Sequence, residues 1–229
     1  MDESYSDYSD ETESTVLSKW EDIPDDENGV ATVTGASYRI NDDPGSPRGH
    51  AYICHDQRFL SVSAHLKDYY LFHLLNCYGD ETGIILVRMI EDTQRLNLLL
   101  QNLGFSPTPI DNSLPQRTHL AFVKAFHSKK PALLITTHAV ANELKIPPVN
   151  FMIYYDIPPD RLTYKDQTSE RVDLEKGKVF SLVASNEMKL WNRIIRDQGC
   201  VPQLPLDKDE VLRFADEVKT AQKLAARDP

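Results

Sequence analysis

His50, Cys54 and His55 form a cluster whose side chains could bind a metal ion, since imidazole and thiolate are preferred zinc ligands. A structural zinc site needs four such ligands at a defined spacing. The remaining cysteines, Cys77 and Cys200, stand far from this cluster and from each other. The spacing therefore predicts an ordinary loop and no metal site.

His138 is the other side chain with catalytic potential, because it lies where an α/β protein would place a site. Two apolar runs, residues 132–135 and 149–155, flank a segment whose Ala and Leu content favours a short helix. Two strands joined by a helical crossover imply parallel pairing, and ligands bind beyond the carboxyl ends of such strands. No serine or cysteine nucleophile accompanies His138 in the sequence, so we expect an ordinary substitution there.

Apolar strands alternate with amphipathic helices along most of the chain, which predicts a doubly wound parallel α/β sheet. Strands are predicted at residues 52–62, 83–87, 106–110, 132–135, 149–155 and 178–184. Helices are predicted at residues 65–78, 92–103, 115–127, 136–145, 186–198 and 207–226, and residues 160–176 are expected to be irregular. Asp92 is the expected N-cap of the second helix, and Gly104 its stop.

The negative charge of the chain is concentrated at its N-terminus. The formal net charge is −10, and residues 1–29 alone hold eleven acidic residues against one lysine. Residues 30–229 hold 24 acidic and 24 basic residues, which disfavours nucleic-acid binding unless a local basic stripe is present. Residues 1–48 are predicted to be a disordered acidic tail, and residues 49–229 a single lobe.

The acidic tail, the cysteines and the lack of a long apolar run indicate where in the cell the protein is expected. The tail is expected to solubilise the protein, and phosphorylation of Ser6, Ser9 or Ser14 beside acidic residues is the alternative. Three separated cysteines predict reduced thiols in the cytosol or nucleus. No apolar run approaches the roughly 20 residues of a membrane span, so no membrane association is expected.

Four collinear stretches resemble the C-terminal, RecA-like lobe of DEAD-box RNA helicases, nearest to the subgroup that processes ribosomal RNA. They are KDYYLFHLLN at residues 67–76, EDTQRLNLLLQNLGF at 91–105, TTHAVANELKIPPVNFMIYYDIP at 136–158 and EVKTAQKLA at 217–225. The resemblance covers most of residues 50–227. It implies a single RecA-like sheet.

The residues that work in that family are mostly replaced here. The resemblance implies RNA contacts at Arg88, Gln116 and Thr137, which are retained. Positions that the family fills with other residues are Leu86, Met89, Asp111, Asn112, His119, His138, Asn142, Glu143 and Lys145. The framework is thus kept while its chemistry changes.

The largest departure lies at residues 164–173, where the family pattern YIHR-x-GR-xx-R becomes YKDQTSERVD. The resemblance implies that the family's arginines here stabilise charge on the ATP γ-phosphate. Their positions hold Gln167, Glu170 and Asp173, and Arg171 stands one position out of register. Carboxylates facing a triphosphate would repel it. The sequence also has no G-x-x-x-x-G-K-[ST] loop and no Asp-Glu-Ala-Asp, so we expect no ATP binding by this chain alone.

We therefore expect a catalytically inactive helicase C-terminal lobe that acts as a protein-interaction or regulatory module, without a cofactor and with an unidentified protein partner. Three alternatives stay open. One is a weak residual RNA-binding module in ribosome biogenesis that uses Arg88, Gln116 and Thr137. Another is the C-terminal half of a split ATP-dependent RNA helicase, and the last is a decaying paralogue. The expected location is the nucleus or cytoplasm, with the nucleolus implied by the resemblance only.

Overall fold

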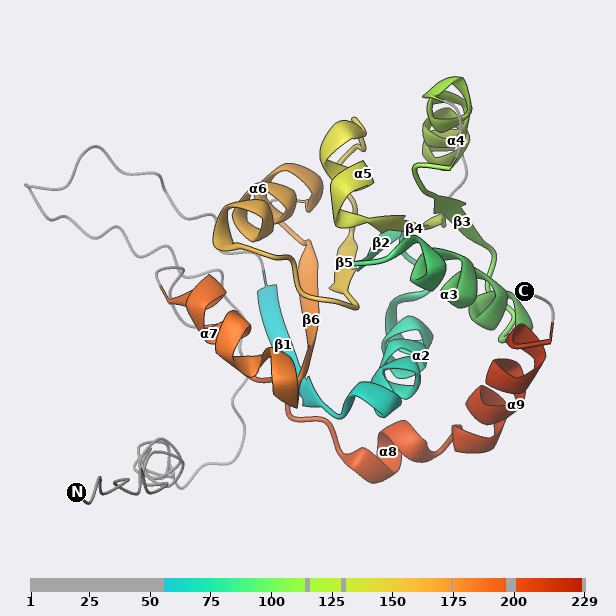
Figure 1. The fold of residues 1–229 in the computed structure, drawn as a ribbon, viewed down its shortest axis with the longest axis vertical. Helices are drawn as coiled ribbons and strands as arrows, with labels where there is room; N and C mark the ends of the chain where they lie inside the picture. Colours follow the sequence, from blue (N-terminus) through green and yellow to red (C-terminus); the bar gives the residue numbers. More distant parts are fainter. Residues whose placement is uncertain (1–55, 114–115, 129–130, 174, 197–200, 228–229) are drawn as a thin grey trace, which may run out of the picture. The chain divides into compact units, whose positions relative to one another are not determined.

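A computed structural model describes residues 56–113, 116–128, 131–173, 175–196 and 201–227, all within one compact unit (Figure 1). The predicted tail and the cluster of His50, Cys54 and His55 lie outside the described residues. No described helix is long and apolar enough to cross a membrane.

The described residues form one six-stranded sheet with the order β1-β6-β5-β2-β4-β3. Its strands are β1 (Asp56–Val62), β2 (Gly83–Val87), β3 (Pro107–Ile110), β4 (Leu133–Thr137), β5 (Phe151–Tyr154) and β6 (Lys178–Ala184). Every neighbouring pair is parallel, which confirms the predicted doubly wound sheet. The predicted direct pairing of the strands at residues 132–135 and 149–155 was wrong, because β2 lies between β4 and β5.

Helices cover both faces of the sheet, as Figure 1 shows. They are α2 (Lys67–Tyr78), α3 (Ile90–Asn102), α4 (Gln116–Ser128), α5 (His138–Glu143), α6 (Arg161–Arg171), α7 (Met188–Ile195), α8 (Lys208–Leu212) and α9 (Ala215–Ala225). Two short 3-10 turns, η1 (Ala64–Leu66) and η2 (Ser185–Glu187), precede α2 and α7.

The core is divided into two apolar layers by the alternation of side chains along each strand. In β2, Ile84 and Leu86 pack with α4, α5, α6 and α7 on one face, whereas Ile85 and Val87 pack with α2, α3 and α9 on the other. A strand covered on both faces is apolar at every position. This explains why the apolar run at residues 83–87 matched β2 to the residue.

Helix α6 contradicts the expectation of an irregular segment at residues 160–176. Asp160 begins it as N-cap, with its carboxylate accepting hydrogen bonds from the Thr163 backbone N at 2.9 Å and the Thr163 hydroxyl at 2.8 Å. Its buried face consists of Tyr164, Gln167, Thr168 and Arg171, which follow the helical period but are mostly polar. Hydrophobic periodicity therefore could not reveal this helix.

Three other predicted helices differ in detail. Helix α3 begins at Ile90 with Met89 as its N-cap residue, so Asp92 lies in the first turn and is not the cap. Helix α2 begins at Lys67, two residues after the predicted start, and it is buried from Lys67 to Leu75 on all sides. The last predicted helix is broken into α8 and α9.

A buried lysine joins the carboxyl end of the sheet to helix α2. The Lys67 Nζ donates to the Tyr155 carbonyl oxygen at 2.8 Å, to Asp156 Oδ1 at 3.0 Å and to Glu187 Oε2 at 2.9 Å. Glu187 in turn accepts from the Ala184 backbone N. An ammonium ion has three donors, and here each one has a protein acceptor. The residue therefore connects α2, the end of β5 and the turn after β6.

Gly83 lies against an aromatic ring. A Cβ atom added at this residue would overlap the ring of Phe151, which is fully buried. We expect Gly83→Ala to lower the free energy of unfolding by about 1–3 kcal/mol, the usual cost of overpacking a core. Urea denaturation of Gly83→Ala and of Gly83→Ala/Phe151→Leu would test this. A double variant no more stable than the single one would show that the Phe151 ring is not the obstacle.

Removing the charge of Lys67 should be costly. Lys67→Met keeps most of the side-chain volume but leaves Asp156 and Glu187 without their shared cation. Breaking a buried ion pair by removing one partner costs about 3–5 kcal/mol. Thermal and urea denaturation should show this loss. The exposed Lys223→Met on α9 serves as the control and should change stability by about 0.5 kcal/mol or less. Equal effects of the two substitutions would contradict the role assigned to Lys67.

Candidate functional site

The carboxyl edge of the sheet brings two of the three predicted RNA-contact residues together. Thr137 ends β4, and its register partner on β2 is Val87, which directly precedes Arg88. The third, Gln116, is the first residue of α4 and follows β3, the strand beside β4; its side chain lies outside what the structure describes. The topology therefore places all three positions at one edge.

Arg88 already has an anionic partner. Its guanidinium nitrogen Nη2 lies 2.8 Å from Glu187 Oε1, and its backbone N donates to Asp156 Oδ2 at 3.1 Å. Its side chain remains 53% exposed. An incoming phosphate would have to compete with, or share the guanidinium with, the Glu187 carboxylate.

Thr137 is engaged in the fold. Its hydroxyl oxygen accepts a hydrogen bond from the Val140 backbone N at 3.3 Å and so caps α5. The residue is 4% exposed. This local role satisfies an otherwise unpaired helix N–H group and leaves little of Thr137 for a ligand to touch.

His138, Asn142 and Gln167 form a hydrogen-bonded set, which we call the amide–imidazole network; His138 and Gln167 are buried, and Asn142 is exposed. Gln167 Nε2 donates to Asn142 Oδ1 at 2.8 Å and to the His138 carbonyl oxygen at 3.0 Å. Its Oε1 lies 3.2 Å from His138 Nδ1. The two donated bonds fix the orientation of the Gln167 amide, since its nitrogen must face two oxygens. The network thus links α5 to α6.

His138 is therefore a packed residue and not an open catalytic base. It is 7% exposed, and its ring stacks on Tyr154 with centroids 5.9 Å apart. Burial lowers the pKa of His138, while hydrogen bonding to Gln167 and to the Asp156 carbonyl opposes the shift. Both ring nitrogens face an oxygen, Nε2 the Asp156 carbonyl at 2.8 Å and Nδ1 the Gln167 amide at 3.2 Å, and a neutral ring can donate to only one of them. The expectation of an ordinary substitution at His138 agrees with this packing.

Arg171, the arginine out of register in the sequence, points into the fold. Its Nη2 donates to the Ala141 carbonyl oxygen at 2.6 Å, and the residue is 4% exposed. Its Nη1 lies 3.4 Å from the Glu170 carboxylate. The guanidinium thus satisfies a carbonyl of α5, where it is unavailable to a nucleotide at the surface.

Neighbouring positions of α6 present carboxylates outward. Asp166 and Glu170 are exposed, and Ser169 between them is exposed as well. Asp173, beyond the helix, accepts from the backbone N atoms of Glu175 and Lys176 in a turn. The exposed surface of this segment is therefore anionic at the positions where the resemblance expects a histidine and an arginine.

His138, Asn142 and Gln167 stand at changed positions in the sequence, but the pattern does not predict that these residues contact one another. The available signal was that all three stand where the resemblance expects charged side chains and that all three are uncharged hydrogen-bonding residues. Uncharged residues that together replace several charged ones can be expected to contact one another in the fold.

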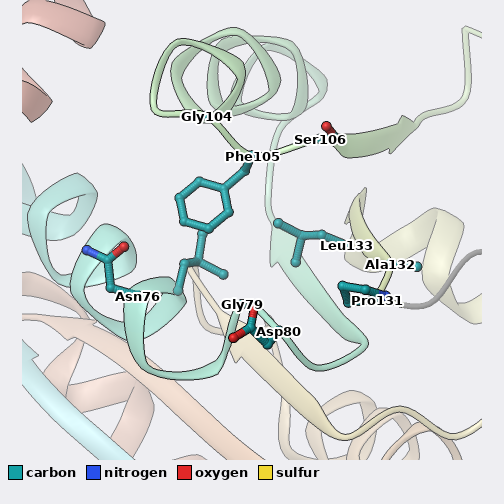
Figure 2. Close-up of a pocket in the computed structure, with 10 residues that line it drawn as sticks. Asn76, Gly79, Asp80, Gly104, Phe105, Ser106, Pro131, Ala132 and Leu133 are labelled. Atoms are coloured by element: carbon teal, nitrogen blue, oxygen red, sulfur yellow. The ribbon is translucent and has the colours of Figure 1, made fainter.

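Cofactor and metal sites were not expected. Among the described residues, no group of three or more His, Cys, Asp and Glu side chains is placed to hold a metal ion. A cavity of about 480 Å³ opens at the opposite, amino end of the sheet, between the ends of α2 and α3 and the start of β4 (Figure 2). Phe105, Pro131 and Leu133 line it with Asn76 and Asp80. It is remote from the carboxyl edge.

Comparison with known proteins agrees with the resemblance seen in the sequence. Residues 66–174 match the family described as helicase conserved C-terminal domain. The chain is 39% identical over 172 residues to the ATP-dependent rRNA helicase rrp3 of Aspergillus terreus and 33% identical over 171 residues to RRP3 of Ajellomyces capsulatus. These alignments cover 74% of this chain but only 39% and 35% of the relatives. The chain thus spans well under half the length of the relatives it matches.

Solved structures show the same fold. The C-terminal domain of the DEAD-box protein Dbp5 superposes with a TM-score of 0.62 at 22% identity, covering 70% of this chain and 96% of that one. The E. coli DEAD-box protein SrmB, bound to RraA, gives 0.61 at 21% identity and covers 68% of this chain and 92% of that one. The sequence match over residues 66–174 and this shared fold together confirm the predicted assignment. The chain is therefore similar to the helicase conserved C-terminal domain family over residues 66–174 and to ATP-dependent rRNA helicases in sequence, and it has the fold of DEAD-box C-terminal domains.

Proposed function

We propose that this chain is a helicase C-terminal lobe that does not support ATP hydrolysis and that acts by binding another protein. The observation that carries the proposal is the amide–imidazole network. Three positions at which the resemblance implies charged working residues hold His138, Asn142 and Gln167, which are joined through the Gln167 amide nitrogen: it donates to the Asn142 side chain and to the His138 carbonyl oxygen. His138 and Gln167 are buried, so these positions contribute to the packing of α5 against α6.

Phosphoryl transfer needs cations near the γ-phosphate, and removal of such an arginine costs several orders of magnitude in rate. Here Gln167 is fully buried and uncharged, and Glu170 adds a carboxylate. Arg171 is held against the Ala141 carbonyl. Within the described part of α6, no arginine faces the surface at the positions that the family uses. This supports the absence of hydrolysis.

A protein partner is favoured by what the lobe retains. The packed core and the six-stranded sheet match those of C-terminal lobes that were solved with protein partners, SrmB with RraA and Dbp5 with Gle1. A lobe can keep such a docking surface without catalysis, because binding depends on shape and surface chemistry. The rRNA helicase relatives favour a setting in ribosome biogenesis and hence a nuclear or nucleolar location.

RNA binding is the second candidate, because Arg88 keeps a half-exposed guanidinium at the carboxyl edge and domain 2 of Mss116p was solved on an RNA duplex. Two contacts weigh against it. Arg88 is paired with Glu187, and the Thr137 hydroxyl caps α5. The neutral total charge of residues 30–229 adds no compensating attraction.

The proposal predicts that this chain does not complete a split helicase. An isolated N-terminal lobe of a DEAD-box rRNA helicase should show the same RNA-stimulated ATPase rate with and without this chain. As positive control, the C-terminal lobe native to that N-terminal lobe should raise the rate under the same conditions. Phosphate release would be measured with both lobes at several concentrations.

A rise of the ATPase rate with this chain, approaching that of the native lobe, would overturn the proposal and favour the split helicase. In that case the variant Arg171→Lys would show whether the buried guanidinium contributes. A flat rate with both lobes would instead mean that the assay itself fails, which the positive control is there to detect.

Because burial favours the neutral form of His138, we expect the stability of the fold to depend on pH. Because burial lowers its pKa in the folded protein, the unfolded chain binds the proton more readily, and stability falls as the pH drops below about 6.5. Above the ordinary histidine pKa this contribution is constant. The free energy of unfolding should fall by at most about 1.4 kcal/mol for each pH unit. Urea denaturation between pH 5.5 and 7.5 would measure it.

The variant His138→Gln removes the titrating group and should flatten this pH dependence, while the remaining histidines provide a common background. Proton NMR of the ring, assigned by its absence in the variant, should give a pKa below the ordinary value. A pKa above that value would mean that the two facing oxygens, Gln167 Oε1 and the Asp156 carbonyl, hold an imidazolium. The network would then be cationic, contrary to the proposal.

A further inference from the structure

A basic pocket lies between the start of α6 and the outer side of α7, two helices that contact each other and are neighbours in Figure 1. Its volume is about 440 Å³. Three arginines line it, Arg161 from α6 and Arg193 and Arg196 from α7 and its end. All three are exposed. The apolar part of its wall comes from Pro159, Leu190 and Ile194.

The charge of this surface departs from the neutral total of residues 30–229. Lys189, Arg193 and Arg196 follow one another at intervals of four and three residues, so they share one face of α7. No acidic residue occurs between Met188 and Arg196. This is the kind of local basic stripe that a neutral total charge can hide.

The acidic residue of the pocket is already engaged. Asp160 lines it together with the three arginines, but its two carboxylate oxygens accept from the backbone N and hydroxyl of Thr163. These bonds lower the pKa of Asp160 and hold its charge at the start of α6. The pocket as described therefore keeps an excess of positive charge.

The wall of the pocket is rigid and carries an apolar rim. Trp191 and Ile194 are fully buried, and the Trp191 ring packs on Phe59 and Tyr164 at 5.7 and 5.5 Å between centroids. These contacts fix α7 against β1 and α6. Leu162 is not among the lining residues, but it follows Arg161 in the chain and its side chain is 66% exposed, so it adds apolar surface next to the pocket. A preorganised surface loses less entropy when it binds.

We propose that this pocket binds an acidic segment of a protein partner, in which carboxylates flank an aliphatic side chain. Guanidinium groups pair with carboxylates in a bidentate manner, and the Leu190 and Leu162 side chains offer apolar contact to the aliphatic one. The proposal deepens the proposed function, on which it rests only in taking a protein as the partner.

A peptide is favoured over RNA by the lining of the pocket. Among the described residues that line it, none has an aromatic ring on which a base could stack, and part of the wall is aliphatic. The arginines also lie on the helical surface near β1 and β6, whereas Arg88 and Thr137 end strands nearer the other side of the sheet. The pocket is therefore not an extension of the predicted RNA-contact residues.

The probe is a fluorescein-labelled peptide of about 12 residues made of Asp and Glu with one central Leu, titrated with the full chain at low and moderate salt. We expect saturable binding that weakens with salt. The variant Arg193→Glu/Arg196→Glu should weaken it about tenfold or more, and Leu162→Ser by a smaller factor, since every tenfold loss corresponds to about 1.4 kcal/mol. Lys223→Glu on α9, an exposed charge reversal elsewhere, should leave it unchanged.

Thermal denaturation confirms that each variant is folded, and Arg193→Gln supplies a milder change if the double reversal is not. The titrations are repeated with residues 36–229, because the eleven carboxylates of residues 2–27 would repel an acidic probe.

Binding that the charge reversal does not weaken, or no binding in either form of the chain, would overturn the proposal. Tighter binding of a labelled single-stranded oligouridylate, lost in Arg193→Glu/Arg196→Glu, would assign the pocket to RNA instead. Neither result depends on ATP hydrolysis. Failure of this inference can thus be told apart from failure of the proposed absence of ATPase activity.

Discussion

The ammonium group of Lys67 holds together the segments that follow β5 and β6 at the carboxyl edge of the sheet. It is almost fully buried, and it joins the end of β5, through the Tyr155 carbonyl and Asp156, to Glu187 after β6. Two carboxylates brought this close would repel one another without a cation between them. Glu187 also pairs with Arg88, and Asp156 accepts from the Arg88 backbone. One buried charge therefore sets the positions of Asp156, Glu187 and Arg88 at the carboxyl edge.

The same edge stays packed at positions where the resemblance expects charged residues. In the amide–imidazole network the Gln167 amide nitrogen donates to Asn142 and to the His138 carbonyl oxygen, and Arg171 binds a carbonyl of the same helix α5. Burying an unpaired polar group costs free energy, and the two donated bonds avoid that cost for the buried Gln167 amide nitrogen. The lobe can therefore pack these side chains between α5 and α6 although the resemblance expects other residues there.

Sequence reasoning recovered the parts of the fold that burial dictates. Strand β2 was predicted to the residue, because a strand covered on both faces is apolar throughout. It missed α6, whose buried face carries Gln167, Thr168 and Arg171, so that the helical period is polar. It also missed the insertion of β2 between β4 and β5, since strand order is not written in the local pattern. The contacts among His138, Asn142 and Gln167 depend on that tertiary arrangement.

Fold and catalysis rest on different numbers of residues. The two apolar layers are shared among dozens of side chains, each of which contributes about 1–3 kcal/mol when buried, so no single one decides the fold. Charge stabilisation of a γ-phosphate instead depends on a few cations at fixed positions. A handful of changes can remove that chemistry and leave the layers intact. Surface charges such as Arg193 and Arg196 do not fill the core, since both residues are exposed. A binding surface on α6 and α7 can therefore persist or arise independently of hydrolysis.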